Sequence, residues 1–391
     1  MAFSNSKAVF VFAGAALLAA SACNGSGAVP PNATAAGNAP QEPAMASDAG
    51  LALPVDTTSI LKKLTKDVEI GSTVDPTNGD KGPHALSVVR TDYVLKKGQL
   101  LVCNFDDKSG TAGAGTTIDV FDPAAGSKAA TFVESANIEG CDGDAITSGN
   151  EVFGAGMTSH VMVSFKPIGK GIKKYGSPIE EPFDNADAPP KPGSLYEPEY
   201  IFTSDAKTGS IVSLSLGSVG SGGGPGKPLQ VATGFAVNGR TGWGALGPSG
   251  LAYASSNQNL YIADGPDNTI VYFTHANNLL EEDEIVVQPG GKTFKCKYPL
   301  SSCGKLVKAG SPLNAPYAMT LLPNGNLIVA NTAGGNLLVE LTPTGQVLDT
   351  KVVDNSKTAG IFGLVAVGTN DDNTVLYYTD SNSNTLQELE Q

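Results

Sequence analysis

The chain has 391 residues, of which 41% are hydrophobic and 16% charged, and a formal net charge of -13. This composition supplies enough apolar material for a sizeable core. The acidic balance repels phosphate backbones, so nucleic acid is excluded as an expected partner. No apolar run reaches the ~20 residues that a helix needs to cross a bilayer.

The first predicted element is a lipoprotein signal peptide over residues 1–22. Lys7 precedes an apolar stretch, and residues 18–23 (LAASAC) resemble a bacterial lipobox, which is cut before its cysteine. The alternative is an ordinary signal peptide cut nearby. We expect a lipid on Cys23. Because Asn24 rather than Asp follows it, we expect a lipid-anchored protein of the bacterial cell envelope, in the outer membrane and facing the periplasm or the surface.

The second predicted element is a flexible tether over residues 23–55, which are rich in Ala, Gly, Pro and Asn. The folded domain is expected to cover residues 56–391. It would begin with a short helix over residues 59–66 and a strand over residues 67–74.

The cysteines support export. With Cys23 set aside, four remain, an even number in an oxidising compartment. Cys296 and Cys303 flank a short loop that suits a local disulfide, and Cys103 and Cys141 would form the second pair. The alternative is free buried thiols.

The domain is organised around a repeated unit, seen most clearly in residues 325–341 (GNLIVANTAGGNLLVEL), which read as two strands joined by a tight turn. The strand before the turn recurs six times at spacings of 49 to 67 residues, and five of the six copies end in Asp or Asn. Repeats of this length with several strands each are typical of β-propellers. We therefore predict an all-β fold, a six-bladed β-propeller of four-stranded antiparallel blades.

Two units depart from the pattern. The last has only three strands, so the strand over residues 67–74 is expected to complete it and to close the ring from the N-terminal side. The third is expected to begin near Leu195. The proline-rich and acidic residues 177–192 before it are predicted to be an insertion.

The repeat resembles NHL-type six-bladed propellers of the TolB-like superfold, through its Ile/Val-Ala-Asp/Asn-x-x-x-Asn pattern. More closely, the chain looks like a group of exported bacterial NHL-like lipoproteins. The stretches that carry this resemblance are residues 99–105 (QLLVCNF), 114–118 (AGTTI), 247–253 (GPSGLAY) and 321–327 (LLPNGNL). The resemblance covers roughly residues 80–391 and implies a fold rather than an activity. Gluconolactonase-like propellers have a metal-binding Glu in an early Glu-Gly-Pro, where this chain has Gly82-Pro83-His84, so lactone hydrolysis is not expected.

A ligand site is predicted at one mouth of the central channel. In a propeller, the loops that enter first strands and those that leave second strands share one face, so polar residues at both places converge there. The ring is rich in oxygen ligands with one imidazole, which suits Ca²⁺, Mg²⁺ or a polyhydroxylated ligand. The predicted ligand-binding residues are His84, Asn104, Asp142, Asp205, Asp264, Tyr317, Asn331 and Asp380.

Structural roles compete with this prediction. Asp and Asn at strand ends commonly accept hydrogen bonds from their own turns. His84 occupies the position that Tyr317 takes in a sibling unit, so its ring either packs or acts as a general base. Asp142 and Asp144 would face the same side of a strand and share a proton or a metal. The neighbouring Cys141 equally suits a stapled structural loop.

The predicted function is a binding or scaffold propeller of the cell envelope, with a protein or glycan ligand. The alternative is a metal-assisted hydrolase or lyase that uses the Asp, Asn and His ring. We expect binding rather than catalysis, and no residue is assigned a catalytic role. The presence and identity of a metal are left open.

Overall fold

A computed structural model describes residues 55–391 except 192, 195, 219–223 and 243. Contacts divide the chain into Met1–Ala52 and Leu53–Gln391, and the description below concerns the second unit. The predicted signal peptide, Cys23 and nearly all of the predicted tether lie outside the described residues. Among the described helices, none has the length and apolar character to cross a membrane.

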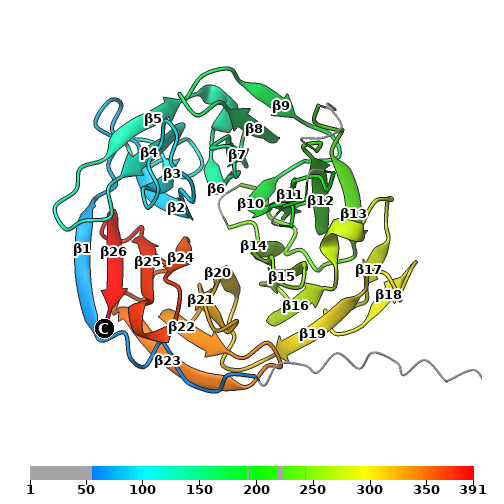
Figure 1. Ribbon diagram of the computed structural model, residues 1–391. Helices are drawn as coiled ribbons and strands as arrows, with labels where there is room; N and C mark the ends of the chain where they lie inside the picture. Colours follow the sequence, from blue (N-terminus) through cyan, green and yellow to red (C-terminus); the bar gives the residue numbers. More distant parts are fainter. Residues whose placement is uncertain (1–54, 192, 195, 219–223, 243) are drawn as a thin grey trace, which may run out of the picture. The chain divides into compact units, whose positions relative to one another are not determined.

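Six antiparallel sheets succeed one another around a central axis (Figure 1). The domain is a six-bladed β-propeller, as predicted. Blades one to three consist of β2 (Lys81–Val88), β3 (Leu100–Asp106), β4 (Thr117–Phe121) and β5 (Ala130–Glu134); β6 (Cys141–Ile146), β7 (Val152–Gly156), β8 (Val161–Phe165) and β9 (Lys173–Tyr175); and β10 (Pro182–Ala188), β11 (Tyr200–Asp205), β12 (Ser210–Ser215) and β13 (Leu229–Thr233).

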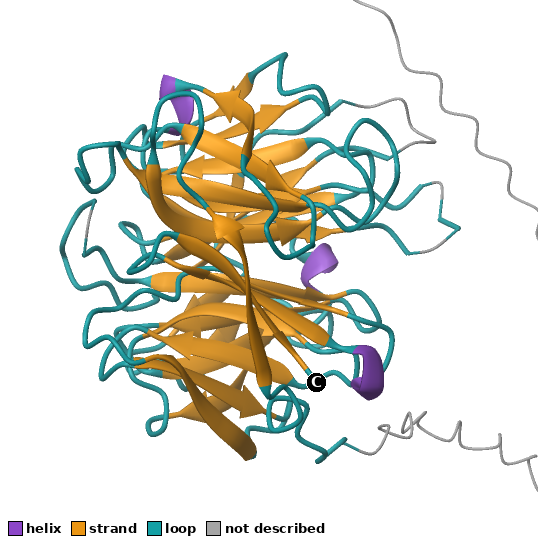
Figure 2. Ribbon diagram, turned by 90° about the vertical axis from the view of Figure 1, so that its left-hand side faces the viewer, coloured by secondary structure: helices purple, strands orange, loops and turns teal. Residues whose placement is uncertain are grey.

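Blades four to six consist of β14 (Pro248–Ala254), β15 (Asn259–Asp264), β16 (Thr269–Phe273) and β19 (Gly304–Ala309); β20 (Pro316–Leu321), β21 (Leu327–Asn331), β22 (Asn336–Leu341) and β23 (Val347–Asp354); and β24 (Leu364–Val367), β25 (Val375–Asp380), β26 (Thr385–Glu390) and β1 (Lys66–Ser72). Strands dominate the described chain, and its helices are single 3₁₀ turns (Figure 2). They are η1 (Ala136–Ile138), η2 (Ala276–Asn278) and η3 (Asp371–Asn373).

The sixth blade is closed from the N-terminal side, as predicted. β1 pairs with β26 in antiparallel register, with Lys66 opposite Glu390 and Ser72 opposite Thr385. The prediction of a short helix before this strand is wrong. A turn at Ile60 stands there instead, in which the Leu64 N–H donates to the Ile60 carbonyl at 3.2 Å.

Glu340 fixes this turn to the fifth blade. Its fully buried carboxylate accepts hydrogen bonds from the Ser59 hydroxyl at 2.7 Å and from the backbone N–H groups of Ile60 at 3.1 Å and Leu61 at 2.8 Å. Asn326 Nδ2 lies 3.4 Å from the same carboxylate. The Glu340 side chain, rather than the predicted helix, therefore orders the start of the domain.

The insertion predicted over residues 177–192 is also wrong, because this segment contains β10, the first strand of the third blade. β10 pairs with β11 over Asn185 to Ala188. Its sequence, PFDNADA, lacks an apolar pattern since its Asp and Asn side chains are directed towards the central axis. A strand whose inner face is polar is therefore easily mistaken for a loop.

A hairpin inserted in the fourth blade joins the sheet of the third. β17 (Ile285–Val287) and β18 (Phe294–Cys296) lie in sequence between β16 and β19, yet β17 pairs in parallel with β13. The Cys296–Cys303 disulfide ties the end of this hairpin to the start of β19. The Cys103–Cys141 disulfide likewise joins β3 of the first blade to β6 of the second, so both predicted pairings are confirmed.

First strands of neighbouring blades approach one another closely at glycines. A Cβ atom on Gly143 of β6 would lie 2.5 Å from the Phe183 carbonyl oxygen of β10, and one on Gly250 of β14 would lie 2.3 Å from the Tyr317 carbonyl oxygen. No side chain fits in either place, so glycine permits the narrow centre of the ring. Apolar side chains fill the space between the blades, as in the cluster that contains Phe105, Phe183 and Phe362.

Candidate functional site

A pocket of about 240 Å³ opens at the mouth where the first strands begin. We call it the mouth pocket. Its walls are the side chains of His84, Phe105, Phe183, Tyr317 and Phe362, and the loop before β14 supplies Asn238 and Arg240 to its rim. The first strands position the inner side chains, because each strand starts at this face and directs its first residues towards the axis.

His84 lies between two aromatic rings. Its imidazole stacks on Phe105 with ring centroids 4.2 Å apart and planes 9° apart, and on Phe362 at 4.2 Å and 30°. Phe183 packs against Tyr317 at 4.6 Å. These contacts fix the orientation of the imidazole before any ligand arrives.

Asp142 joins the two polar side chains of the pocket. Its Oδ1 pairs with His84 Nδ1 and accepts a hydrogen bond from the Tyr317 hydroxyl at 2.9 Å. The Tyr317 hydroxyl also lies 3.3 Å from His84 Nδ1. All three side chains are buried. Burial and the neighbouring Asp142 carboxylate raise the pKa of the Tyr317 hydroxyl well above its usual value.

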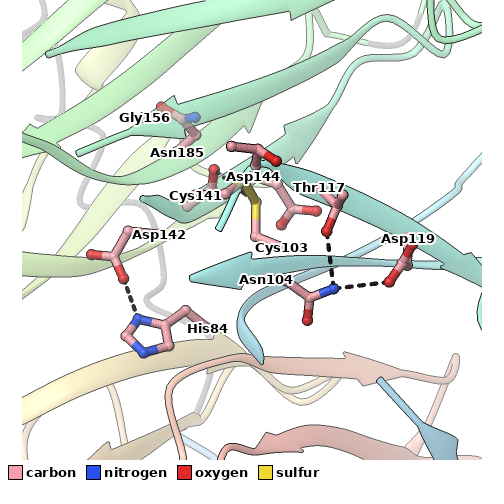
Figure 3. The surroundings of a disulfide bond; sticks show 12 residues. His84, Cys103, Asn104, Thr117, Asp119, Cys141, Asp142, Asp144, Gly156 and Asn185 are labelled. Atoms are coloured by element: carbon pink, nitrogen blue, oxygen red, sulfur yellow. Dashed lines mark hydrogen bonds and ion pairs between the residues drawn. A yellow bond between two sulfur atoms is a disulfide. The ribbon is translucent and has the colours of Figure 1, made fainter. Parts of the chain in front are cut away.

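This arrangement leaves one imidazole nitrogen for a ligand. Since Asp142 engages Nδ1, Nε2 is the ring nitrogen without a hydrogen-bond partner among the described residues, and Figure 3 shows the imidazole with Nδ1 directed at Asp142. A carboxylate that holds Nδ1 in this way fixes the orientation of the imidazole. The cluster is therefore able to donate or accept a hydrogen bond at one defined point.

The other five predicted ligand-binding residues do not meet at this pocket. Asn104 donates from Nδ2 to Thr117 at 3.2 Å and to Asp119 at 2.9 Å within its own blade (Figure 3). Asn331 bonds the backbone of Pro312 and Asn314.

The strand-ending aspartates bond their own turns. Asp205 accepts from the backbone N–H groups of Glu180, Glu181, Lys207 and Thr208. Asp380 accepts from the Asn382 N–H and the Ser383 hydroxyl. The structure thus brings together three of the eight residues and gives four of the others turn or sheet contacts. Their roles in binding stay predictions.

Asp264 differs from the other strand-ending residues. Its carboxylate is fully buried, and neither oxygen has a hydrogen-bond partner among the described residues. In the equivalent turns the residue two positions on, Lys207 or Asn382, donates its backbone N–H. Here that residue is Pro266, which has none. Burial and the nearby Asp267 carboxylate raise the pKa of Asp264 to about 7.

The expected pairing of Asp142 with Asp144 is not found, since the two carboxylates have different partners. Asp142 bonds His84 and Tyr317, whereas Asp144 accepts from the Ser87 hydroxyl at 2.9 Å. The described residues contain no group of three or more His, Cys, Asp or Glu side chains placed to hold a metal ion. Trp243, the single tryptophan of the chain, lies outside the described residues.

Sequence reasoning missed the aromatic walls of the mouth pocket. Phe105, Phe183 and Phe362 are absent from the predicted ligand-binding residues. A signal was present for Phe105, because it directly follows the strand-ending Asn104. Phe183 lies in the segment that was predicted to be an insertion.

Comparison with known proteins supports the fold. No protein-family model and no curated protein matches the chain. Among solved structures, it is similar to a gluconolactonase from Xanthomonas campestris, with 11% identity, coverage of 83% of this chain and 91% of that one, and a TM-score of 0.52. Virginiamycin B lyase from Staphylococcus aureus matches at 15% identity over 83% and 85% of the two chains, with a TM-score of 0.48.

A second gluconolactonase-type structure, itself described only as putative, matches at 12% identity over 83% and 91% of the two chains, with a TM-score of 0.49. At 11% identity the similarity to the Xanthomonas protein shows the fold alone. The expected likeness to six-bladed propellers is therefore confirmed at the level of the fold.

Proposed function

We propose that this protein is a lipid-anchored envelope propeller that binds one sugar ring of a glycan in the mouth pocket. The observation that carries the proposal is a pocket with aromatic walls and a single fixed polar cluster, His84, Asp142 and Tyr317. Aromatic faces suit the apolar C–H face of a sugar ring, and the polar cluster suits one of its hydroxyls.

The size of the pocket supports a small ligand group. Pockets for drug-sized molecules occupy roughly 300–1,000 Å³, and the mouth pocket has about 240 Å³. One ring at the end of a chain fits this volume better than a protein surface does. A glycan is therefore favoured over a protein, the other ligand class predicted from the sequence.

The predicted lipid anchor would place this binding in the cell envelope. Cleavage before Cys23 and a tether over residues 23–55 would hold the propeller near a membrane in the envelope, where cell-wall and surface glycans are within reach. Metabolic labelling of the expressed protein with a fatty acid tests the anchor. Loss of the label in Cys23→Ala is the expected result.

Binding is tested by calorimetric titration of the tether-free propeller with soluble cell-wall oligosaccharides. Tyr317→Phe keeps the aromatic wall but removes the hydroxyl, and Arg240→Ala removes a polar group from the rim. Both variants should weaken binding, by about tenfold for a lost hydrogen bond to a buried cluster. Arg90→Ala, which lies away from the mouth pocket, is the matched control. No binding, or binding that both mouth variants retain in full, would overturn the proposal.

One observation favours a second function, acid–base catalysis of hydrolysis or elimination. The Asp142 carboxylate holds His84 Nδ1, and Nε2 has no hydrogen-bond partner in the described chain, the arrangement that a general base requires. His84→Gln should then abolish turnover while leaving binding of the same ligand measurable. Equal turnover in His84→Gln and the unmodified protein would remove this candidate.

The metal-assisted form of that function lacks a ligand set among the described residues, so we derive no step through a metal. A thermal melt with EDTA and then with added Ca²⁺ or Mg²⁺ tests it directly. A metal at 100 times its dissociation constant adds ~2.7 kcal/mol to the free energy of unfolding. A midpoint that falls with EDTA and recovers with metal would revive this alternative.

A further inference from the structure

A second pocket lies at the opposite end of the first strands. It has a volume of about 210 Å³ and is lined by residues from β2, β6, β10, β14, β20 and β24. We call it the acidic pocket, because three of its polar side chains are the carboxylates of Asp144, Asp184 and Asp187. Phe362 borders both pockets. The proposed glycan site uses none of these carboxylates.

Two of the three carboxylates lack partners on one oxygen. Asp144 Oδ2 accepts from the Ser87 hydroxyl at 2.9 Å, and Asp187 Oδ2 from Arg90 Nη1 at 3.1 Å. The Oδ1 atom of each has no hydrogen-bond partner among the described residues, although the residues are only 4% and 6% exposed. A buried carboxylate without donors is costly unless something completes its coordination.

The charges of the pocket do not balance. Three carboxylates face one guanidinium, that of Arg90, and no other described ion pair reaches them. Burial raises the pKa of Asp184 to about 7, even though the backbone N–H groups of Leu251 and Asn185 work against the rise. Burial and the neighbouring Glu199 hold the pKa of Asp187 well above its usual value, against the effect of Arg90. The pocket's own basic groups therefore do not offset the cost of charging these carboxyls, and a bound cation would favour their ionised forms.

One donor accompanies the acceptors. Asn185 lines the pocket and is 5% exposed, and its Nδ2 has no partner among the described residues. Its Oδ1 is already engaged by the Thr203 hydroxyl at 2.7 Å. A ligand that fills the pocket must therefore offer several donors and at least one acceptor.

We propose that the acidic pocket binds a small organic cation with a primary ammonium group and a hydroxyl or carbonyl oxygen beside it. The ammonium donates to the unpartnered Oδ1 atoms of Asp144 and Asp187, and the adjacent oxygen accepts from Asn185 Nδ2. An ammonium has three donors and no acceptor, which matches two acceptors that lack donors. A neutral polyol would match the hydrogen bonds but would leave the carboxylates without a counter-charge.

The test compares matched amines and neutral molecules by thermal shift and calorimetric titration of the tether-free propeller. Glucosamine and N-acetylglucosamine share a ring, but only glucosamine has the ammonium group. Ethanolamine and ethylene glycol form a second, smaller pair. Glucosamine and ethanolamine should raise the melting midpoint more than their neutral partners do, because the mouth pocket would bind both members of the sugar pair alike. Stabilisation by ethanolamine alone would indicate that the natural cation is a small or headgroup-sized amine rather than an amino sugar.

Asp144→Asn identifies the site. The substitution keeps an acceptor for Ser87 and nearly the same shape, and it should weaken glucosamine binding about tenfold or more, since a hydrogen bond to a charged group is lost. Tyr317→Phe in the mouth pocket should leave the affinity for the amines unchanged. This pair of variants separates failure of the cation site from failure of the proposed glycan site.

Arg90→Gln is expected to raise the affinity for glucosamine, whereas Asp144→Asn lowers it. The Arg90 side chain is 54% exposed, so its replacement should not prevent folding, and it frees Asp187 from the internal cation. Glucosamine should then bind more tightly than it does to the unmodified protein. Equal stabilisation by glucosamine and N-acetylglucosamine, the absence of any amine effect, or unchanged affinity in both Asp144→Asn and Arg90→Gln would overturn the proposal.

Discussion

The two pockets of the propeller share several first strands but differ in the hydrogen bonds of their buried carboxylates. At the mouth pocket, Asp142 is the carboxylate, and one of its oxygens is bonded to both His84 and Tyr317. At the acidic pocket, two residues along β6, Asp144 has only the Ser87 hydroxyl. The two carboxylates of β6 thus differ in their partners, two for Asp142 and one for Asp144, although each keeps one oxygen without a hydrogen-bond partner among the described residues.

The comparison shows where a ligand has most to contribute. In the mouth pocket, aromatic packing and hydrogen bonds already fix the polar cluster, so a ligand finds a formed surface. In the acidic pocket, burial of carboxylate oxygens without partners raises the free energy of the folded state. A cation that bonds these oxygens would remove this cost. The first site is suited to selecting a shape and the second to selecting a charge.

The largest expected effect comes from removing the Asp142 carboxylate of the mouth pocket. Asp142→Ala leaves the buried His84 and Tyr317 groups without their shared acceptor. Loss of one partner from such a cluster should lower the free energy of unfolding by about 3 kcal/mol, and the midpoint by about 2 °C for each kcal/mol. Urea unfolding monitored by fluorescence measures the change. Glu282→Ala, at an exposed position, serves as the control, and a loss no larger than in that control would contradict the prediction.

Glu340 is a buried carboxylate that accepts hydrogen bonds on both oxygens, and it lines neither pocket. Glu340→Ala removes the acceptor for Ser59, Ile60 and Leu61 and should cost about 2 kcal/mol. Glu340→Gln, which retains one acceptor oxygen, should cost less. Limited proteolysis should also cut the released segment before β1 sooner. An unchanged cleavage rate in Glu340→Ala would show that this carboxylate does not hold the segment in place.

Buried carboxyl groups with raised pKa values should make the propeller less stable as the pH rises. Burial raises the pKa of Asp184 and Asp264 to about 7 and that of Asp119 to about 9. Each group holds its proton more tightly when folded, so its contribution is complete below the unfolded pKa near 4. It is lost progressively as the pH rises to the folded pKa, at up to about 1.4 kcal/mol per pH unit for one group.

The expected observation is a melting midpoint that falls between pH 5 and pH 8. Asp264→Asn should make this fall shallower, because the amide does not titrate and one raised pKa is removed. Midpoints measured by calorimetry in non-coordinating buffers provide the test. A midpoint that rises over this range, or an identical slope in Asp264→Asn, would contradict the assigned cause.

The smallest expected effect is a gain in stability from Asp144→Asn. A neutral amide replaces a carboxyl whose pKa burial holds well above its usual value, so less free energy is needed to keep the site buried. The gain should be about 1 kcal/mol at pH 8 and close to zero at pH 5. Urea unfolding at the two pH values measures it. A loss of stability at pH 8 would mean that Asp144 already has a favourable partner in the folded state.

The sequence predicted the ring well because the second and third strands of the blades are largely apolar and their turns are regular. In five blades the residue before the third strand has a positive φ angle, and in four of them it is Gly or Asn, whose turn signal is readable in the chain. The disulfides followed from the spacing and number of the cysteines. His84, Asp142 and Tyr317 were found because each stands where a first strand begins.

The acidic pocket could not be found in the same way. Asp184, Asn185 and Asp187 make β10 look like a polar loop, since strand patterns assume an apolar inner face. Asp144 was noticed, but only as a neighbour of Asp142. At the strand ends the sequence predicted too many ligand-binding residues. Asp205 and Asp380 already accept hydrogen bonds from their own turns, and the sequence alone does not show which carboxylates are bonded in this way.

The closure of the ring by β1 has a consequence for biogenesis. β1 is synthesised long before its partner β26, in which Glu390 pairs with Lys66. Throughout synthesis β1 has an open edge that can pair with another chain, and the sixth blade cannot assemble. The edge of β1 must therefore be shielded until β26 has been made, so the step that completes the fold is also the one that ends its exposure to aggregation.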